Sequence, residues 1–362
     1  MSMQGGACQA SQKEDWWRWS WAARHGAHLV TKLCNSAKSM LGTSGFRQRV
    51  PCFSSDQHVA LLWQTMRLSL LAVGAAAVVV ATAVYSRRRA TLCLWWIQQR
   101  RLRRRLIETD LVDAGAVSLV GGVDVSFIKD SETDACAALV VCSLPSLEVV
   151  YERYERVVLK APYIPGYLAF REVDFLVSLL AELQASQPRL FPSVVLVDGN
   201  GILHPNRFGL ACHLGVLAGV ATVGIGKTLH CVDGLTREGL QRLTQAGCAR
   251  AGDSADLVGD SGAVWGAALR TTDPDPKRAP KGAGTGGNAL FKPVIVSIGH
   301  GLSLASALKL VRRCIKHRIP EPVRQADLRS REWLRSHSGA AGGAVRFGAA
   351  SRPVDRSSPE PA

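Results

Sequence analysis

The sequence predicts an α/β fold in which a mixed sheet is flanked by helices, and three observations lead to this fold class. Three strand-like runs in the first half of the chain follow one another with only short turns between them, which is typical of an antiparallel meander. In the second half, helical and strand-like segments alternate, as they do in α/β proteins. One strand of that half, 192–197, is apolar apart from Ser193, which is typical of a parallel strand covered on both faces.

The elements are expected in a fixed order along the chain. An amphipathic helix comes first, because apolar residues recur at helical spacing and end in a charged face. The meander follows, and then a helix with a buried side of Leu, Val and Phe residues. The expected helices are 92–110, 167–183, 208–218 and 302–317, and the expected strands are 118–127, 135–144, 147–159, 192–197, 221–225, 263–270 and 293–298.

Composition divides the chain into three parts. A catalytic domain is expected at 91–337, with a Pro-, Gly- and Lys-rich loop insertion at 272–288. The Gly, Ala, Arg, Ser and Pro content of 338–362 predicts a disordered tail. The formal charge of +15 is concentrated at the other end: residues 1–106 hold 16 of the 44 Lys and Arg and 3 of the 29 acidic residues, which gives +13. The high charge therefore describes the basic extension, 1–90, together with the arginines of the helix that follows it, and says little about residues 107–362.

One segment of the extension favours a membrane. Residues 68–85 carry no charge and are bounded by arginines, although about 18 residues is close to the lower limit for spanning a bilayer. A buried helix is the alternative for the same segment. The 10 cysteines are scattered without a C-x-x-C pair, which favours a reducing compartment over a zinc site. We expect the cytoplasm and the nucleus, including the nucleolus, with membrane anchoring through 68–85 as the alternative.

Three carboxylates stand out by their positions. Asp124 lies in the middle of an apolar strand, where an isolated charge is costly to bury unless it is paired or holds a cation. Asp198 follows a buried strand directly, at the place where α/β proteins bind ligands, although an aspartate that begins a turn would look the same. Glu172 alone is weaker, because helices carry many surface glutamates. Together the three suit Mg²⁺, which prefers oxygen ligands.

Two further residues follow predicted strands. Lys227 stands after Gly224-Ile225-Gly226 and could donate to a phosphate or stabilise its developing charge, whereas a lone lysine is more often solvated. His300 follows another predicted strand and could assist an attacking water or bind a phosphate. A histidine with a purely structural role is the alternative for that position.

Several long motifs, spread over 95–333, resemble the endonuclease V family. They include GGVDVSF, YERYERVVLKAPYIPGYLAFRE, VDGNGILHP, FGLACHLGVL, GIGK, VSIGHGLSL and RIPEPVRQAD. The resemblance implies a ribonuclease H-like fold and a metal site made by Asp124, Glu172 and Asp198. It also implies Mg²⁺ or Mn²⁺ as the cofactor. The implied activity is cleavage of strands that contain inosine or deoxyinosine at the second phosphodiester 3′ to that nucleotide.

The resemblance also implies a set of substrate-binding residues. Pro162 and Pro165 stiffen a loop that presents Tyr163, and a rigid aromatic ring suits stacking in the space left by an extruded base. A tyrosine packed at the base of the loop is the alternative. Glycines at 166, 199 and 201 let the backbone approach a ligand closely. In the family the base site forms around the positions of Gly166, Leu168, Gly199 and His204.

The chain departs from the family pattern in two places. Many members have Arg-Gly after the His-Pro of the VDGNGILHP run, where this chain has Asn206-Arg207. Arg207 is expected to replace the phosphate contact from the neighbouring position. After His300, the basic residue usual in animal relatives is Gly301, which removes another phosphate contact.

We therefore expect a Mg²⁺-dependent, monomeric endonuclease whose substrate is single-stranded RNA that contains inosine. Cleavage of deoxyinosine in DNA, as a repair enzyme, is the alternative within the same chemistry. The alternative of another class is an inosine-RNA binding protein without catalytic activity. The catalytic residues expected are Asp124, Glu172, Asp198, Lys227 and His300, and the substrate-binding residues are Tyr163, Pro165, Gly166, Leu168, Gly199, Gly201, His204 and Arg207.

Overall fold

The computed structural model describes residues 55–128, 131–273 and 291–337, with some side chains between 55 and 75 left out. The chain divides into two compact units, Met1–Ala81 and Thr82–Ala362. The predicted tail, 338–362, and most of the predicted loop insertion, 272–288, lie outside the described residues. The same holds for the first 54 residues of the predicted extension.

A long helix, α2 (Ser55–Arg103), begins in the first unit and ends in the second. It contains the predicted helix 92–110 as far as Arg103, after which the chain leaves helical geometry. The apolar segment 68–85 lies within α2, although several of its side chains are outside the described residues. Within the part of the chain that the structure describes, no helix is long and apolar enough to cross a membrane.

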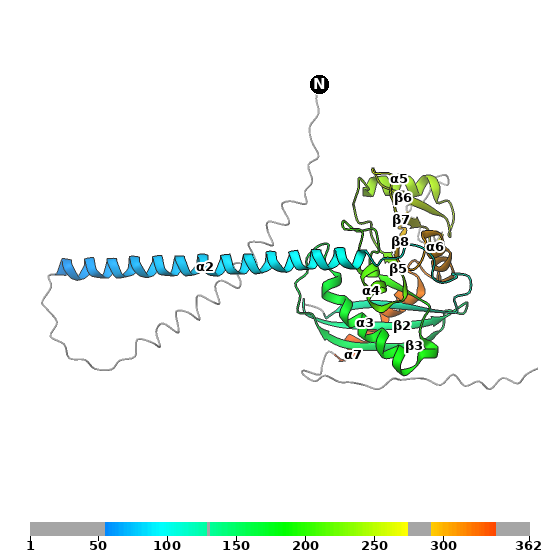
Figure 1. The fold of residues 1–362 in the computed structure, drawn as a ribbon, viewed down its shortest axis with the longest axis horizontal. Helices are drawn as coiled ribbons and strands as arrows, with labels where there is room; N and C mark the ends of the chain where they lie inside the picture. Colours follow the sequence, from blue (N-terminus) through cyan, green and yellow to red (C-terminus); the bar gives the residue numbers. More distant parts are fainter. Residues whose placement is uncertain (1–54, 129–130, 274–290, 338–362) are drawn as a thin grey trace, which may run out of the picture. The chain divides into compact units, whose positions relative to one another are not determined.

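The second unit is built on one sheet of eight strands in the order β3-β2-β1-β4-β5-β8-β7-β6 (Figure 1). The predicted meander is confirmed, since its strands pair antiparallel. The apolar strand β4 pairs parallel with β1 on one side and with β5 on the other, as its composition predicted. The strands are β1 (Leu119–Phe127), β2 (Asp134–Ser143), β3 (Val149–Val158), β4 (Val194–Asp198), β5 (Ala221–Gly226), β6 (Ser254–Val258), β7 (Val264–Leu269) and β8 (Val294–His300).

Helices cover both faces of this sheet, so the predicted mixed sheet flanked by helices is confirmed. Alternate residues of β4 show the two layers: Val195 and Val197 pack with α3 (Ala169–Ser186) and α4 (Leu210–Ala218), whereas Val194 and Leu196 pack with α6 (Leu304–Arg313) and α7 (Glu321–His337). The burial of both sets of β4 side chains is the reason that its sequence shows no polar alternation.

Two helices and one strand were not predicted from the sequence. They are α5 (Arg237–Gly247), β6 and α7. Each buries few large side chains, as in β6, where Leu257 alone is fully buried. The seven cysteines among the described residues are all free thiols.

Candidate active site

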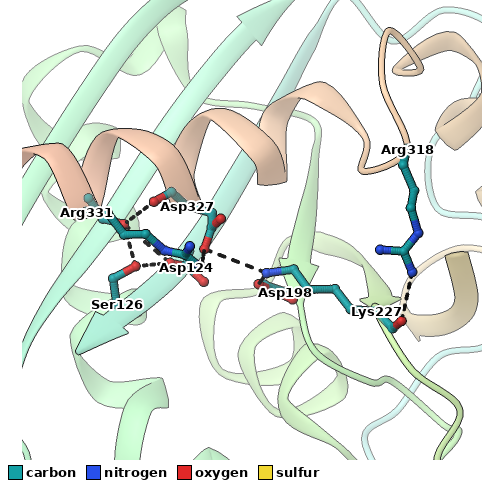
Figure 2. A network of polar contacts seen from close by, with 8 residues as sticks. Asp124, Ser126, Asp198, Lys227, Arg318, Asp327 and Arg331 are labelled. Atoms are coloured by element: carbon teal, nitrogen blue, oxygen red, sulfur yellow. Dashed lines mark hydrogen bonds and ion pairs between the residues drawn. The ribbon is translucent and has the colours of Figure 1, made fainter. Parts of the chain in front are cut away.

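Parallel pairing of β1 with β4 brings two aspartates to the same edge of the sheet. Val123 is in register with Val197, so Asp124 and Asp198 are the next residues along the two neighbouring strands. A third aspartate, Asp327, comes from α7. One carboxylate oxygen from each of the three lies within 4.8 Å of the other two, and Figure 2 shows these side chains facing one another. The cluster therefore joins an inner position of β1 and the end of β4 to a helix from the last part of the chain.

Hydroxyl groups hold the Asp124 carboxylate in place. Ser126, two residues further along β1, donates to Asp124 Oδ2 at 2.7 Å. Ser330 of α7 donates to the Ser126 hydroxyl at 2.7 Å and lies 3.4 Å from the same Oδ2. Asp124 is only 8% exposed, and burial, followed by the charge of Asp198, raises its pKa to about 7. A carboxylate in this setting favours a partner of positive charge.

Glu172 lies in the first turn of α3 and is 6% exposed. It is not one of the three carboxylates within 4.8 Å, but it is close enough to be influenced by them. Burial raises its pKa to about 8, and the charges of Asp124 and Asp198 act in the same direction, while the neighbouring Arg171 opposes them. Glu172 is therefore a fourth carboxyl group beside the cluster.

Asp327 was not identified from the sequence, although it is the last residue of the quoted run RIPEPVRQAD. Its helix can reach β1 because Gly122 has no side chain. A Cβ at Gly122 would lie 2.1 Å from the carbonyl carbon and oxygen of Pro322. The spacing of Val323, Ala326 and Leu334, which are all buried, is the helical signal that could have found α7.

Lys227 joins two of the aspartates. Its Nζ donates to Asp198 Oδ2 at 2.5 Å and lies 3.7 Å from Asp327 Oδ1 (Figure 2). Burial lowers the pKa of Lys227, but the hydrogen bond and charge of Asp198 and the charges of the other aspartates outweigh it, so the net shift is upward. Its backbone carbonyl accepts from Arg318 at 2.9 Å, which fixes the backbone after β5. Lys227 is therefore a charged ammonium group inside the acidic cluster.

The donor set fits a hard divalent cation. Carboxylate oxygens are the ligands that Mg²⁺ and Mn²⁺ prefer, and here they are crowded, with Asp124 buried and the other two aspartates half-buried. The pKa values of Asp124 and Glu172 are raised first by burial and then by the negative charge of the neighbouring aspartates. Asp124, Asp198 and Asp327 could hold such an ion, with Glu172 beside them.

The structure does not bring His300 to this cluster. β8 runs antiparallel to β5, and His300 is in register with Thr222 near the start of β5, whereas Lys227 follows its end. The four positions from Thr222 to Gly226 correspond to roughly 13 Å along a strand. His300 Nδ1 instead accepts from the N–H of Ile107 at 3.3 Å. Gly301, next to it, adopts a left-handed φ of 67° and donates its N–H to the Ile107 carbonyl.

The predicted loop between β3 and α3 is exposed at its tip. Tyr163 is 64% exposed, and Pro165 is exposed beside it. Gly166 has a left-handed φ of 82°, a conformation that favours glycine, and Leu168 precedes the first residue of α3 half-buried. Because Tyr163 is exposed at the tip, it does not pack at the base of the loop, which was the alternative for this residue.

His204 lies against the Gly166 turn. Its Nδ1 accepts from the Asn206 N–H at 3.1 Å, and its Nε2 is 3.9 Å from the place of a Cβ on Gly166. Burial, followed by the charge of His230, lowers the pKa of His204 to about 4 against a hydrogen bond to the Gly166 backbone. The ring is therefore neutral near pH 7, with its proton on Nε2. His204 and Gly166 were both predicted for base recognition, and the structure brings them together.

The remaining predicted residues have structural contacts of their own. Gly199 has a φ of 154°, and a Cβ at Gly201 would lie 1.8 Å from the Ile298 carbonyl oxygen, so both backbone positions require glycine. Arg207 lies 3.6 Å from Glu108 and places its guanidinium 4.8 Å from the centre of the Trp265 ring. Arg207 is thus paired and stacked rather than free to replace a phosphate contact without rearrangement.

Comparisons with known proteins agree with this fold. A family model described as Endonuclease V matches residues 100–328. Endonuclease V of Mus musculus is 50% identical over 227 residues, which make up 62% of this chain and 62% of that protein. The chain thus covers less than two thirds of the length of this relative.

Two crystal structures extend the likeness to three dimensions. The catalytic domain of human Endonuclease V has a TM-score of 0.63 and 44% identity, covering 69% of this chain and 98% of that one. Endonuclease V of Ciona intestinalis, in complex with a 23mer DNA containing an inosine followed by a ribo-adenosine, has a TM-score of 0.60 and 35% identity. That match covers 68% of this chain and 98% of the other.

The sheet and the helices on its two faces, with the acidic cluster where β1 and β4 run parallel, define an α/β protein with the predicted ribonuclease H-like fold. The family follows from the match over residues 100–328, which is more than half of the chain. The chain belongs to the endonuclease V family.

Proposed function

We propose that this protein is a Mg²⁺-dependent endonuclease that cuts single-stranded RNA containing inosine at the second phosphodiester 3′ to the inosine. The observation that carries the proposal is the cluster of Asp124, Asp198 and Asp327, with Glu172 beside it, in a chain of the endonuclease V family. An active site for metal-dependent phosphodiester hydrolysis needs such a concentration of oxygen ligands.

Mg²⁺ or Mn²⁺, when bound by these carboxylates, would supply Lewis-acid polarisation of the phosphate and a lowered pKa for water. The chain's own residues set the conditions for this chemistry. Ser126 and Ser330 fix the orientation of the Asp124 carboxylate, and burial of Asp124 and Glu172 keeps the carboxylates in a setting of low water content. Oriented ligands of this kind lower the reorganisation that the reaction requires.

Lys227 is a cationic group of the site that can act on the phosphate, beside Arg331, which pairs with Asp327 at 2.6 Å. Its ammonium group pairs with Asp198 and Asp327 in the structure. With Asp198 and Asp327 holding a metal ion, the Lys227 ammonium group would be free to donate to a phosphate oxygen, where charge develops during cleavage. Lys227 would then pair first with the two carboxylates and later with the phosphate.

Base recognition is assigned to the loop of Tyr163 and to the turn that follows β4. The exposed Tyr163 is suited to stacking where the base leaves its strand. Gly166, Leu168, Gly199 and His204 then form the base site proposed for hypoxanthine. Hypoxanthine lacks the 2-amino group of guanine, so backbone placed close to that edge would reject guanine sterically.

A DNA strand containing deoxyinosine is the second candidate substrate, and the Ciona relative in complex with inosine-containing DNA favours keeping it. A binding protein without catalytic activity is supported less well, because a site that only binds RNA has no need for four carboxyl groups held close together. Matched RNA and DNA strands with one inosine separate these candidates.

The test is cleavage of single-stranded 5′-labelled RNA and DNA oligonucleotides, each with one inosine, by the full chain with Mg²⁺ and with EDTA. We expect Mg²⁺-dependent cutting one phosphodiester beyond the inosine's own 3′ bond, faster on RNA, and lost in Asp124→Ala. Tight binding of the RNA without any cutting by folded wild type would overturn the proposal in favour of the binding protein.

We also propose that the protein acts as a monomer in the cytoplasm and nucleus, including the nucleolus, rather than as a membrane-anchored enzyme through 68–85. The free cysteines among the described residues agree with a reducing compartment. Carbonate extraction of cells that express the full chain tests the location. Retention in the membrane pellet would favour the anchor instead.

A further inference from the structure

Gln99 of α2 is a buried polar residue that the proposed catalytic and substrate-binding set does not include. It is 2% exposed, although its neighbours Gln98 and Arg100 on the same helix are exposed. A buried amide without partners would be costly, so its contacts explain why it is tolerated there.

Each of its contacts goes to a segment that carries predicted base-recognition residues. Gln99 Nε2 donates to the Phe208 carbonyl at 2.8 Å and lies 3.4 Å from the Gly166 carbonyl. Its Oε1 accepts from Asn206 Nδ2 at 2.7 Å. The two carbonyls can only accept, so they fix which end of the Gln99 amide carries the hydrogens. That orientation in turn fixes the amide of Asn206.

The same contacts continue to His204. The backbone N–H of Asn206 donates to His204 Nδ1 at 3.1 Å, and the other side of that ring meets the Gly166 backbone. Gln99, Asn206, His204 and Gly166 therefore form a closed ring of polar contacts. The ring joins α2 to two loops that are more than 30 residues apart in sequence.

Aromatic packing places α2 firmly against one of these loops. Trp95, one helical turn before Gln99, stacks on Phe170 at 5.0 Å with an interplanar angle of 8°, and it lies 5.9 Å from the Tyr167 ring. On the other side, Leu102 packs with Phe208 and Ile202. Apolar contacts on both sides of Gln99 therefore fix the position of α2, and with it the position of the Gln99 amide.

We propose that Gln99 is a positioning residue for base recognition, which holds the Gly166 turn and the His204 to Phe208 segment at a fixed separation so that hypoxanthine is accepted and guanine is rejected. The inference rests on the proposed function. Steric rejection of one amino group requires rigid segments around the base site, and a displacement of about 1 Å is enough to lose the discrimination between the two bases.

The test compares four proteins made as the full chain. Gln99→Leu keeps the approximate volume and removes all three contacts. Gln99→Glu keeps the oxygen that accepts from Asn206 and removes the donor to the Gly166 and Phe208 carbonyls. Gln98→Leu, on the exposed side of the same helix, is the matched control. Single-turnover kcat/KM is measured on strands with inosine or guanosine at one position, and thermal unfolding checks that each protein is folded.

We expect both Gln99 variants to lower the inosine-to-guanosine ratio by about tenfold or more, and Gln98→Leu to leave it unchanged. A folded Gln99→Leu with the wild-type inosine-to-guanosine ratio overturns the inference. An equal loss of kcat/KM on both strands also overturns it, because such a loss indicates only a structural role for Gln99. If Gln99→Leu does not fold, Gln99→Glu decides by the same ratio. If wild type cuts neither strand, the proposed function itself is overturned. If wild type cuts the inosine strand, the proposed function stands, and the Gln99 variants test only the positioning role.

Discussion

Lys227 occupies the place in the acidic cluster where positive charge is needed, at 2.5 Å from one carboxylate oxygen of Asp198. The ammonium group and a divalent cation would compete for that oxygen. We therefore predict that Lys227→Met binds Mn²⁺ at least as tightly as wild type, yet cuts inosine-containing RNA about 10²-fold more slowly, because it lacks the donor to the phosphate. Calorimetry with Mn²⁺ and single-turnover cleavage measure the two effects.

Lys292, which is exposed, gives the control variant Lys292→Met. Weaker Mn²⁺ binding by Lys227→Met alone would contradict the prediction, since it would mean that the lysine organises the carboxylates rather than competing for them.

Tyr163 presents the opposite situation, a large side chain with little structural role. Because it is 64% exposed, Tyr163→Ala should change the unfolding temperature very little, as surface substitutions usually do. Cleavage should fall, since base stacking by one aromatic ring contributes about 1–3 kcal/mol. Cleavage kinetics and thermal unfolding of the same preparation test this. Wild-type cleavage rates in the variant would remove the stacking role.

At the scale of secondary structure, the approach of α7 to β1 decides whether the cluster is complete. A Cβ at Gly122 would lie 2.1 Å from the backbone of Pro322. Gly122→Ala should therefore push α7 outward and move Asp327 away from Asp124. We predict a loss of stability of about 1–3 kcal/mol, as is usual for overpacking, together with weaker Mn²⁺ binding.

Gly247→Ala is the matched control for this change. A Cβ at Gly247 would meet Ala255 Cβ at 3.4 Å, an ordinary contact, so stability and metal binding should stay at the wild-type level. Denaturant unfolding and Mn²⁺ calorimetry compare the two variants. Equal stability of Gly122→Ala and wild type would show that α7 does not depend on this contact.

The sequence predicted the sheet better than it predicted α7 because the two present different signals. β4 is apolar at every buried position and could be assigned by composition. In α7, polar residues surround the few buried ones, Val323, Ala326 and Leu334 among them, so the helix carries no apolar run. Asp327 was missed with it, because a carboxylate on a polar helix looks like any solvated one.

His300 shows why strand ends alone do not locate a site. The sequence placed it correctly at the end of a strand, but the direction of that strand depends on pairing. The carboxyl ends of parallel strands share an edge, and β8 is antiparallel to β5. His300 therefore lies at the opposite edge from Asp198. Lys227 and Asp198 follow the parallel strands β5 and β4, and the structure does bring them together.

At the scale of the whole molecule, the acidic cluster should make folding stability depend on pH and on metal. Burial raises the pKa of Asp124 from 3.8 to about 7 and that of Glu172 from 4.5 to about 8. Between the unfolded and folded values, the folded protein binds more protons than the unfolded chain. Without metal, stability should therefore be greatest below about pH 4 to 5 as far as these two groups are concerned, and it should fall as pH rises toward about 8.

A divalent cation should reverse this loss. Its ligands must be deprotonated, so binding to the folded protein strengthens as pH rises, and it stabilises the folded state in proportion to its occupancy. We predict that Mg²⁺ or Mn²⁺ raises the unfolding temperature more at pH 8 than at pH 6, and that EDTA removes the increase.

Asp124→Asn separates the two effects, because its amide removes one buried charge and one metal ligand. Relative to wild type, the variant in EDTA should be more stable at pH 8 and should lose less stability between pH 6 and pH 8, and metal should raise its unfolding temperature less. Asp256→Asn, an exposed position on β6, should behave as wild type does. Thermal unfolding at the two pH values, with EDTA and with Mn²⁺, measures all three proteins. If metal raises the unfolding temperature of Asp124→Asn as much as that of wild type at both pH values, the cation does not bind at Asp124.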